Sequence, residues 1–205
     1  MLLGGAIASI IFAVTGLVLI GVKFQEFESA LATPQTPLVI FGLIVFVIFV
    51  VSLHEFAHAT ILVYFGESPR RIGIMLFYLI PAFFCDIINA WRLPNKNQRV
   101  IIALAGVVST FGIAGIVSTI YTVTDTKYSW LAIAAAILYI ESLLNLLPFI
   151  KLDGYIALMA YLDEPKLRDL AMEEWKYFLL LLVSRQRRKL KKLHVVRIFS
   201  AWVRH

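Results

Sequence analysis

The chain has 205 residues, of which 60% are hydrophobic and only 16% are charged, whereas soluble domains average about 25% charged residues. Together with a mean hydropathy of +0.86, this composition excludes an ordinary soluble domain and predicts an integral membrane protein. The net charge of +6 follows the ends of apolar segments and forms no basic face with aromatic platforms. We therefore expect the lipid bilayer, and no nucleic acid, as its partner.

Four apolar segments approach or exceed the length of about 20 residues that a membrane-spanning helix needs. They are residues 4–22, 38–65, 100–123 and 130–150. If the N-terminus is cytoplasmic, the two external loops contain only Lys23 and Lys127 of all the Lys and Arg residues. The positive-inside rule then predicts a multi-pass protein of the plasma membrane with both N- and C-termini in the cytoplasm.

The segment 72–90 follows the second predicted span and begins with an apolar run, 72–84, that basic residues bound on both sides. This run is too short for a helical span, and its Ile, Phe and Tyr content favours an extended backbone. Such backbone is tolerated at membrane depth only where protein or a water-filled cavity satisfies its polar groups. We therefore expect a small re-entrant, sheet-like segment in an otherwise all-α polytopic fold.

The third part of the chain is a basic tail. We expect residues 1–165 to form one membrane domain and residues 166–205 a basic amphipathic cytoplasmic tail. The tail either lies on the anionic cytoplasmic leaflet or is a solvated run that only sets the topology. Its densest basic run comprises Arg185, Arg187, Arg188, Lys189, Lys191 and Lys192.

The second predicted span contains the pentapeptide His54-Glu55-Phe56-Ala57-His58. On a helix, residues four apart project from one face, so both imidazoles can bind one metal ion. Glu55 lies beside that face and can take a proton from a water molecule that the metal activates. Ionisable groups are expensive to bury in a membrane span, which makes a functional site the default interpretation.

A third metal ligand is expected from the sequence Asn-Leu-Leu-Pro-Phe-Ile-Lys-Leu-Asp-Gly at residues 145–154. Asp153 is the candidate. Pro148 interrupts the fourth predicted helix and Gly154 lets the chain turn, so Asp153 can leave the helical register and point inward. The side chain of Asn145 can donate a hydrogen bond to a substrate carbonyl or to the developing oxyanion.

Two further features leave alternatives open. Glu141 lies four residues before Asn145, on the same helix face, and can orient either Asn145 or a zinc ligand. Cys85 is the single cysteine, which excludes an intrachain disulfide and a Cys-rich zinc cage. With Asp86 it forms either an extra ligand pair or a redox switch, or it is a small buried hydrophobic residue.

The two motifs, His-Glu-x-x-His and the later Asn-x-x-Pro-x-x-x-Leu-Asp-Gly, are both complete and in order. Together they resemble the site-2 protease family of intramembrane zinc metalloproteases, over residues 38–158. The resemblance implies that His54, His58 and Asp153 ligate one Zn²⁺ and that Glu55 activates the water. It also implies a helical core with a small membrane-embedded sheet after the first motif.

A narrower likeness concerns residues 80–94 and 152–155, which look like the peptide zinc metalloproteases of bacterial ribosomal-peptide gene clusters. We therefore predict an intramembrane zinc endopeptidase that processes a ribosomally made peptide, with selection by the core or by an accessory membrane partner. One alternative is regulated proteolysis of an anti-sigma factor or another single-span, membrane-tethered regulator. Another is a catalytically silent membrane protein that binds a peptide or confers immunity.

Overall fold

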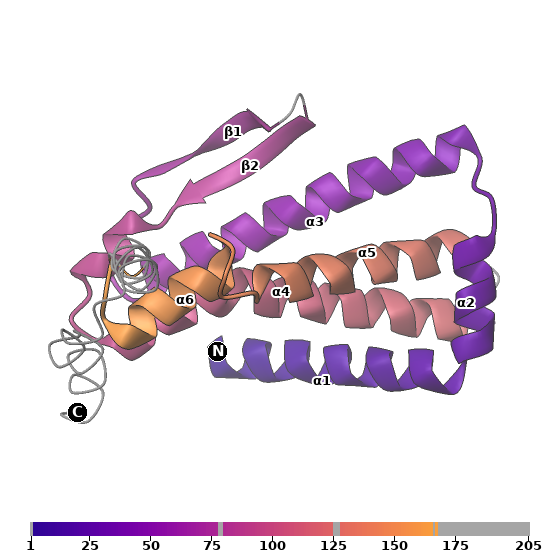
Figure 1. Ribbon diagram of the computed structural model, residues 1–205, viewed down its shortest axis with the longest axis horizontal. Helices are drawn as coiled ribbons and strands as arrows, with labels where there is room; N and C mark the ends of the chain where they lie inside the picture. Colours follow the sequence, from indigo (N-terminus) through magenta and orange to yellow (C-terminus); the bar gives the residue numbers. More distant parts are fainter. Residues whose placement is uncertain (1, 78–79, 125–127, 166, 168–205) are drawn as a thin grey trace, which may run out of the picture. The chain divides into compact units, whose positions relative to one another are not determined.

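The computed structural model describes residues 2–77, 80–124, 128–165 and 167, and Figure 1 shows its helices and strands. All of these elements belong to one compact unit, residues 1–163. The predicted basic tail, residues 166–205, lies outside the described residues except for residue 167, and it stays a prediction. In chain order the elements are α1 (Leu2–Val22), α2 (Phe24–Ala32), α3 (Pro37–Tyr64), β1 (Arg71–Phe77), β2 (Ile80–Asp86), the 3₁₀ helix η1 (Ile88–Arg92), α4 (Lys96–Val123), α5 (Ser129–Asn145) and α6 (Asp153–Leu162).

Three of the described helices, α1, α3 and α4, are long and apolar enough to cross a membrane, and they coincide with the first three predicted spans. The fourth predicted span corresponds to α5, an apolar helix of 17 residues. It ends at Asn145, before residue 150, because Pro148 removes a backbone donor and disfavours helix before it. The structure therefore agrees with a polytopic membrane protein, while the count of four spans stays a prediction.

Helix α3, which bears the first motif, has a defined start and end. The hydroxyl of Thr36 accepts a hydrogen bond from the N–H of Val39 (3.4 Å), and Pro37 follows at the first helical position, where its missing donor costs nothing. At the other end Gly66 has φ +93°, and the N–H of Glu67 bonds to the carbonyl of Leu62. This Schellman ending stops the helix and sends the chain into the β-hairpin.

Helix α4 is central, because it packs against α1, α3, α5 and α6. Its contact with α1 is close: a Cβ at Gly115 would lie 2.1 Å from the carbonyl oxygen of Phe12, and one at Gly112 would lie 2.7 Å from the Cβ of Ser9. Small residues allow such backbone approach between membrane helices. Helix α1 therefore fixes one side of α4, and α4 supplies much of the surroundings of the motif on α3.

The predicted external loop 23–37 contains a helix, α2, which the sequence interpretation missed. Phe27 is buried in α2, and its ring meets that of Tyr121 edge-on, with 5.9 Å between centroids. The Tyr121 hydroxyl also donates to the carbonyl of Glu26 (3.1 Å). Burial of one face of α2 against α5 and the end of α4 makes this short segment helical.

Strands β1 and β2 form an antiparallel hairpin in which Ile72 lies opposite Cys85 and Ile74 opposite Phe83. Strand β2 packs against α3, and Figure 1 shows β1 on the side of β2 that faces away from α3. The ring of Phe83 lies 6.3 Å from that of Phe56 on α3. The predicted sheet after the first motif is confirmed, while its re-entry into the membrane stays a prediction.

Candidate metal centre

Three donor atoms converge where α3 meets the start of α6. The Nε2 atom of His54 lies 2.8 Å from Oδ2 of Asp153 and 3.2 Å from Nε2 of His58, which is 3.3 Å from the same carboxylate oxygen. Both imidazoles are buried, and the Asp153 side chain is 14% exposed. The structure thus brings together the three residues that the two motifs predict as ligands, across 99 residues of sequence.

The outer nitrogens of both imidazoles have partners on α4. Nδ1 of His58 lies 2.7 Å from the carbonyl oxygen of Ile102, which can only accept, so Nδ1 carries a proton and Nε2 is the nitrogen that can bind a metal ion once it is deprotonated. Nδ1 of His54 lies 3.0 Å from the hydroxyl of Thr110. Partners of this kind fix the tautomer and ring orientation of metal-binding histidines.

Gly106 on α4 makes the space in which the two imidazoles meet. A Cβ at this position would lie 2.4 Å from Nε2 of His54 and 2.4 Å from Nε2 of His58. Any larger residue would therefore occupy the place where the two inner nitrogens and Asp153 converge.

The donor set fits zinc. Ligands about 2.0–2.1 Å from a tetrahedral Zn²⁺ ion lie about 3.3 Å from one another, and the observed separations are 2.8, 3.2 and 3.3 Å. Two neutral imidazoles and one carboxylate also match the protein ligands of catalytic zinc sites, which leave a fourth position open. His54, His58 and Asp153 are therefore the residues that would hold the metal ion.

Asp153 reaches the histidines by a different route from the predicted one. It is the first residue of α6, and the chain turns before it, between Leu146 and Leu152. The expectation that Gly154 makes the turn was wrong. Gly154 is helical, and it lacks a side chain because a Cβ would lie 2.2 Å from the Leu146 carbonyl oxygen. Close packing of α6 on the end of α5 thus aims Asp153 inward.

The electrostatics of Asp153 agree with this position. Burial raises the pKa of the carboxyl group, but hydrogen bonds and charge interactions with His54 and His58 outweigh it. The net effect lowers the pKa from an ordinary 3.8 to about 2. The ionised form, which is the one that binds a metal ion, is therefore favoured.

Glu55 is held by the hairpin. Its Oε2 atom accepts a hydrogen bond from the backbone N–H of Cys85 (2.8 Å). This N–H points toward α3 and therefore away from β1. In the hairpin, Cys85 lies opposite Ile72, and the two residues thus form one of the pairs that exchange no hydrogen bonds between the strands. The carboxylate beside the two histidines is thus positioned by strand β2.

Asn145 and Glu141 lie on one face of α5, as the sequence predicts. The amide Nδ2 of Asn145 donates to Oε1 of Glu141, which lies 3.8 Å from Nδ1 of His54. Glu141 therefore touches both of the groups that the sequence offered as its alternatives. Since a carboxylate accepts only, it fixes which way the Asn145 amide points.

Cys85 and Asp86 lie outside the group of converging donors. The Cys85 thiol is half-buried, and burial raises its pKa to about 11, with further upward shifts from the negative charges of Glu55 and Asp86. The thiol is therefore neutral near pH 7, which is unsuited to metal binding. Asp86 caps the next turn, since its Oδ1 accepts from the N–H of Ile88 (3.1 Å).

The sequence interpretation missed three contributors on α4: Ile102, Gly106 and Thr110. Gly106 and Thr110 carry a weak signal, because a small and a polar residue four apart share one face of an otherwise apolar helix. Ile102 carries none, since it acts through its backbone carbonyl. These residues show that α4 completes the centre that α3 and α6 begin.

Comparison with known proteins finds similarity to a protein of Bacillus subtilis (strain 168) that bears the name "Putative peptide zinc metalloprotease protein YydH". The two sequences are 26% identical over 136 residues, which is 65% of this chain and 52% of the relative. The chain thus spans about half the length of the curated relative it matches. No family model matches the chain, and no solved structure matches it. The likeness supports a metalloprotease, the class that the converging donors also favour.

Proposed function

We propose that this protein is an intramembrane zinc endopeptidase of the site-2 protease type, which hydrolyses a peptide bond in a membrane-associated peptide. The observation that carries the proposal is the convergence of His54, His58 and Asp153 with both outer imidazole nitrogens already partnered on α4. Such a set leaves the inner nitrogens free for a metal. The name of the Bacillus subtilis relative supports zinc and peptide hydrolysis.

Bound zinc would supply Lewis-acid chemistry, lowering the pKa of a water molecule and polarising the scissile carbonyl. Glu55 would take the proton of that water as its oxygen attacks the carbonyl carbon. The same carboxyl group would then give the proton to the amine nitrogen as the C–N bond breaks. The second N–H of the Asn145 amide, whose first N–H goes to Glu141, would donate to the carbonyl oxygen.

The hairpin offers a way to present the substrate, which must be extended because a helical amide is shielded. The free edge of β1 is one strand further from Glu55 than β2, about 4.8 Å, so a peptide there would lie far from the metal ligands. The edge of β2 that faces α3 carries the N–H of Cys85 that holds Glu55. Phe83 shares that edge, two residues away. We therefore propose that the hairpin binds the extended peptide as an added strand, with the scissile bond next to the end of β2 that holds Glu55.

The substrate class that we favour is a ribosomally made peptide, trimmed or cut during its maturation. The word "peptide" in the name of the relative supports this class, as does the likeness of residues 80–94 and 152–155 described above. We further propose that the site is reached from the cytoplasmic side, with both chain termini in the cytoplasm. A reporter fused after His205 should then be inaccessible from outside the cell.

The proposal predicts that Glu55→Gln abolishes proteolysis and leaves metal binding intact. Because general acid–base catalysis contributes about 10²- to 10⁴-fold, we expect at least about a 10²-fold loss of rate. Peptides from cells that produce either protein would be compared by mass spectrometry, and zinc would be measured in both purified proteins. Products that appear only with the wild type would name the substrate and the scissile bond together.

The matched control is Glu28→Gln, which neutralises an exposed glutamate on α2. It should give the wild-type peptide pattern. A Glu55→Gln protein that holds zinc, inserts normally and yields every wild-type product would refute catalysis at this site. It would favour instead the alternative of a silent peptide-binding or immunity protein.

A further inference from the structure

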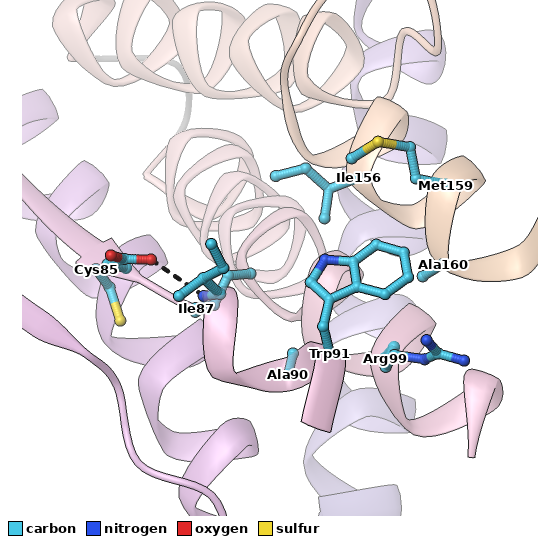
Figure 2. Close-up of a pocket in the computed structure, with 10 residues that line it drawn as sticks. Cys85, Ile87, Ala90, Trp91, Arg99, Ile156, Met159 and Ala160 are labelled. Carbon is cyan, nitrogen blue, oxygen red and sulfur yellow. Dashed lines mark hydrogen bonds between the residues drawn. The ribbon is translucent and has the colours of Figure 1, made fainter. Parts of the chain in front are cut away.

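A cavity of about 300 Å³ lies between the β2–η1 segment, the start of α4 and α6. Figure 2 shows Trp91 in its middle, with Ile156 and Met159 facing the indole ring from α6. Cys85 lies at one end of this view and Arg99 at the other. The volume is at the lower end of the range of about 300–1,000 Å³ for ligand sites, and the walls are mostly apolar, as in such sites.

Arg99 is the unusual member of the lining. It is only 8% exposed, its Nη2 donates to Oδ1 of Asp163 (2.6 Å), and its guanidinium carbon lies 4.9 Å from the centre of the Trp91 ring. Its Nε atom is buried and has no hydrogen-bond partner among the residues that the structure describes. Arg99 thus places a cation, held by Asp163 and Trp91, at the wall of a mostly apolar cavity, where a charged residue typically fixes the orientation of a ligand with the opposite charge.

The cavity adjoins the candidate metal centre on two sides. Cys85, which lines it, holds Glu55 through its backbone N–H, and Ile156 follows Asp153 by three residues on α6. Along α4, Arg99 and Gly106 are seven residues apart, which corresponds to about 10 Å of helix. An extended peptide covers about 3.3 Å per residue. A peptide cut at the metal centre would therefore reach Arg99 with its third residue or so from the scissile bond.

The charges of the lining favour a single carboxylate over a phosphate group. Arg99 is the one cation among the described residues that line the cavity, and Asp86 lines it as well. A phosphate group usually requires several cations or donors, whereas a carboxylate pairs with the planar guanidinium through two parallel hydrogen bonds. The apolar walls around Trp91 would take the neighbouring side chain of the same peptide.

We propose that this cavity is a substrate subsite in which Arg99 binds a peptide carboxylate about three residues from the scissile bond. The carboxylate is either the side chain of an Asp or Glu residue or the C-terminus of the peptide. This inference rests on the proposed peptidase function, but binding and cleavage can be tested separately.

The binding test uses the full-length Glu55→Gln protein in detergent, so that no probe is cut. The probes are fluorescein-labelled pools of ten-residue apolar peptides that contain one Glu or one Gln, each with a free or an amidated C-terminus. Anisotropy should show about tenfold tighter binding of a carboxylate pool. A difference between the Glu and Gln pools would show that a side-chain carboxylate is recognised. A difference between free and amidated peptides would show that the C-terminal carboxylate is recognised.

Adding Arg99→Gln should remove this preference, and Arg99→Lys should weaken it while keeping a cation beside Asp163. Asp163 is 64% exposed, so loss of its partner leaves no buried charge and the variant should fold. The matched control is Arg92→Gln, which removes a cation that is 69% exposed and lies outside the cavity lining. It should retain the full preference.

Equal binding of all pools, or an equal preference with and without Arg99, would overturn the inference. So would a dependence on Arg99 seen only with vesicles that contain phosphatidylglycerol, which would assign the cavity to lipid. The cleavage test repeats the comparison with wild-type Glu55 and reads the products by mass spectrometry. A carboxylate preference without any cleavage would remove the proposed peptidase function and leave the subsite standing.

Discussion

The metal ligands and the general-base candidate lie side by side but are held in different ways. His54 and His58 are buried, and their partners are Thr110 and the carbonyl of Ile102 on the central helix α4. Glu55 is half-buried, and it accepts a hydrogen bond from one backbone N–H of a two-stranded hairpin. The ligands thus belong to the packed helical core, whereas the base depends on a small element that packs against α3.

Because of this difference, we expect that mutations can separate metal binding from catalysis. Substitutions on α4 should weaken metal binding, because α4 supplies the space for the two imidazoles and the hydrogen-bond partners of their outer nitrogens. Substitutions in β2 should leave metal binding intact and change the position of the Glu55 carboxylate.

Gly106→Ala should abolish zinc binding and bring proteolysis below detection. The new methyl group would lie 2.4 Å from both Nε2 atoms, so the imidazoles must move away from Asp153. Alanine is the best helix former, so α4 itself should persist. Metal analysis of the purified variant should show little zinc, while circular dichroism stays helical. Retention of one zinc per chain would contradict the geometry.

The matched control is Gly115→Ala on the same helix. Here the methyl group would lie 2.1 Å from the carbonyl oxygen of Phe12 on α1, and a helix backbone cannot rotate away as a side chain can. We expect a loss of about 1–3 kcal/mol of stability from overpacking, measured by unfolding in denaturing detergent. The folded fraction should still bind zinc, which separates packing of α4 from its role at the centre.

Cys85→Pro should keep zinc but lower the cleavage rate by about 10²-fold, the lower limit expected for general acid–base catalysis. Proline removes the N–H that Glu55 accepts from, and at this position the N–H takes no part in the ladder with Ile72. Cys85→Ala keeps the N–H and should stay within about twofold of the wild-type rate. Equal rates for the two variants would show that the hairpin does not position Glu55.

Thr110→Val should lower zinc affinity by about tenfold, at the weak end of the usual effect of such partners. The effect is small because Glu141 lies 3.8 Å from the same Nδ1 of His54 and can replace the hydroxyl. Competition with a zinc chelator measures the change. Thr119→Val is the control, since its hydroxyl bonds within α4, to the carbonyl of Gly115, and it should leave affinity unaltered.

Much of the fold and of the donor set was predictable from sequence, and the exceptions have a common physical cause. Hydropathy predicted α1, α3 and α4, because each residue contributes its own free energy of transfer into lipid and these contributions can be summed along the sequence. The spacing of His54 and His58 placed both on one helix face. Asp153 was predictable because a motif marks it.

Contacts between elements that are distant in the sequence could not be predicted. The bond from Cys85 to Glu55 and the space at Gly106 depend on how closely two elements approach, which no local pattern encodes. Helix α2 was missed for the same reason, because burial of Phe27 against Tyr121 stabilises it. The role of Gly154 was misjudged, since close packing on Leu146 and not a turn requires it.

The smallest effect expected is on the Cys85 thiol, which reports directly on the neighbouring Glu55. Burial, the Glu55 charge and the Asp86 charge raise its pKa to about 11, and only the thiolate reacts with iodoacetamide. Alkylation of this single cysteine should therefore rise about tenfold per pH unit between pH 8 and 10. Glu55→Gln removes one negative charge, so the pKa should fall and alkylation at pH 9 should be faster than in Glu28→Gln. Equal rates in these two variants would mean that the carboxylate does not lie against the hairpin, and the base would then have to be positioned from α3 alone.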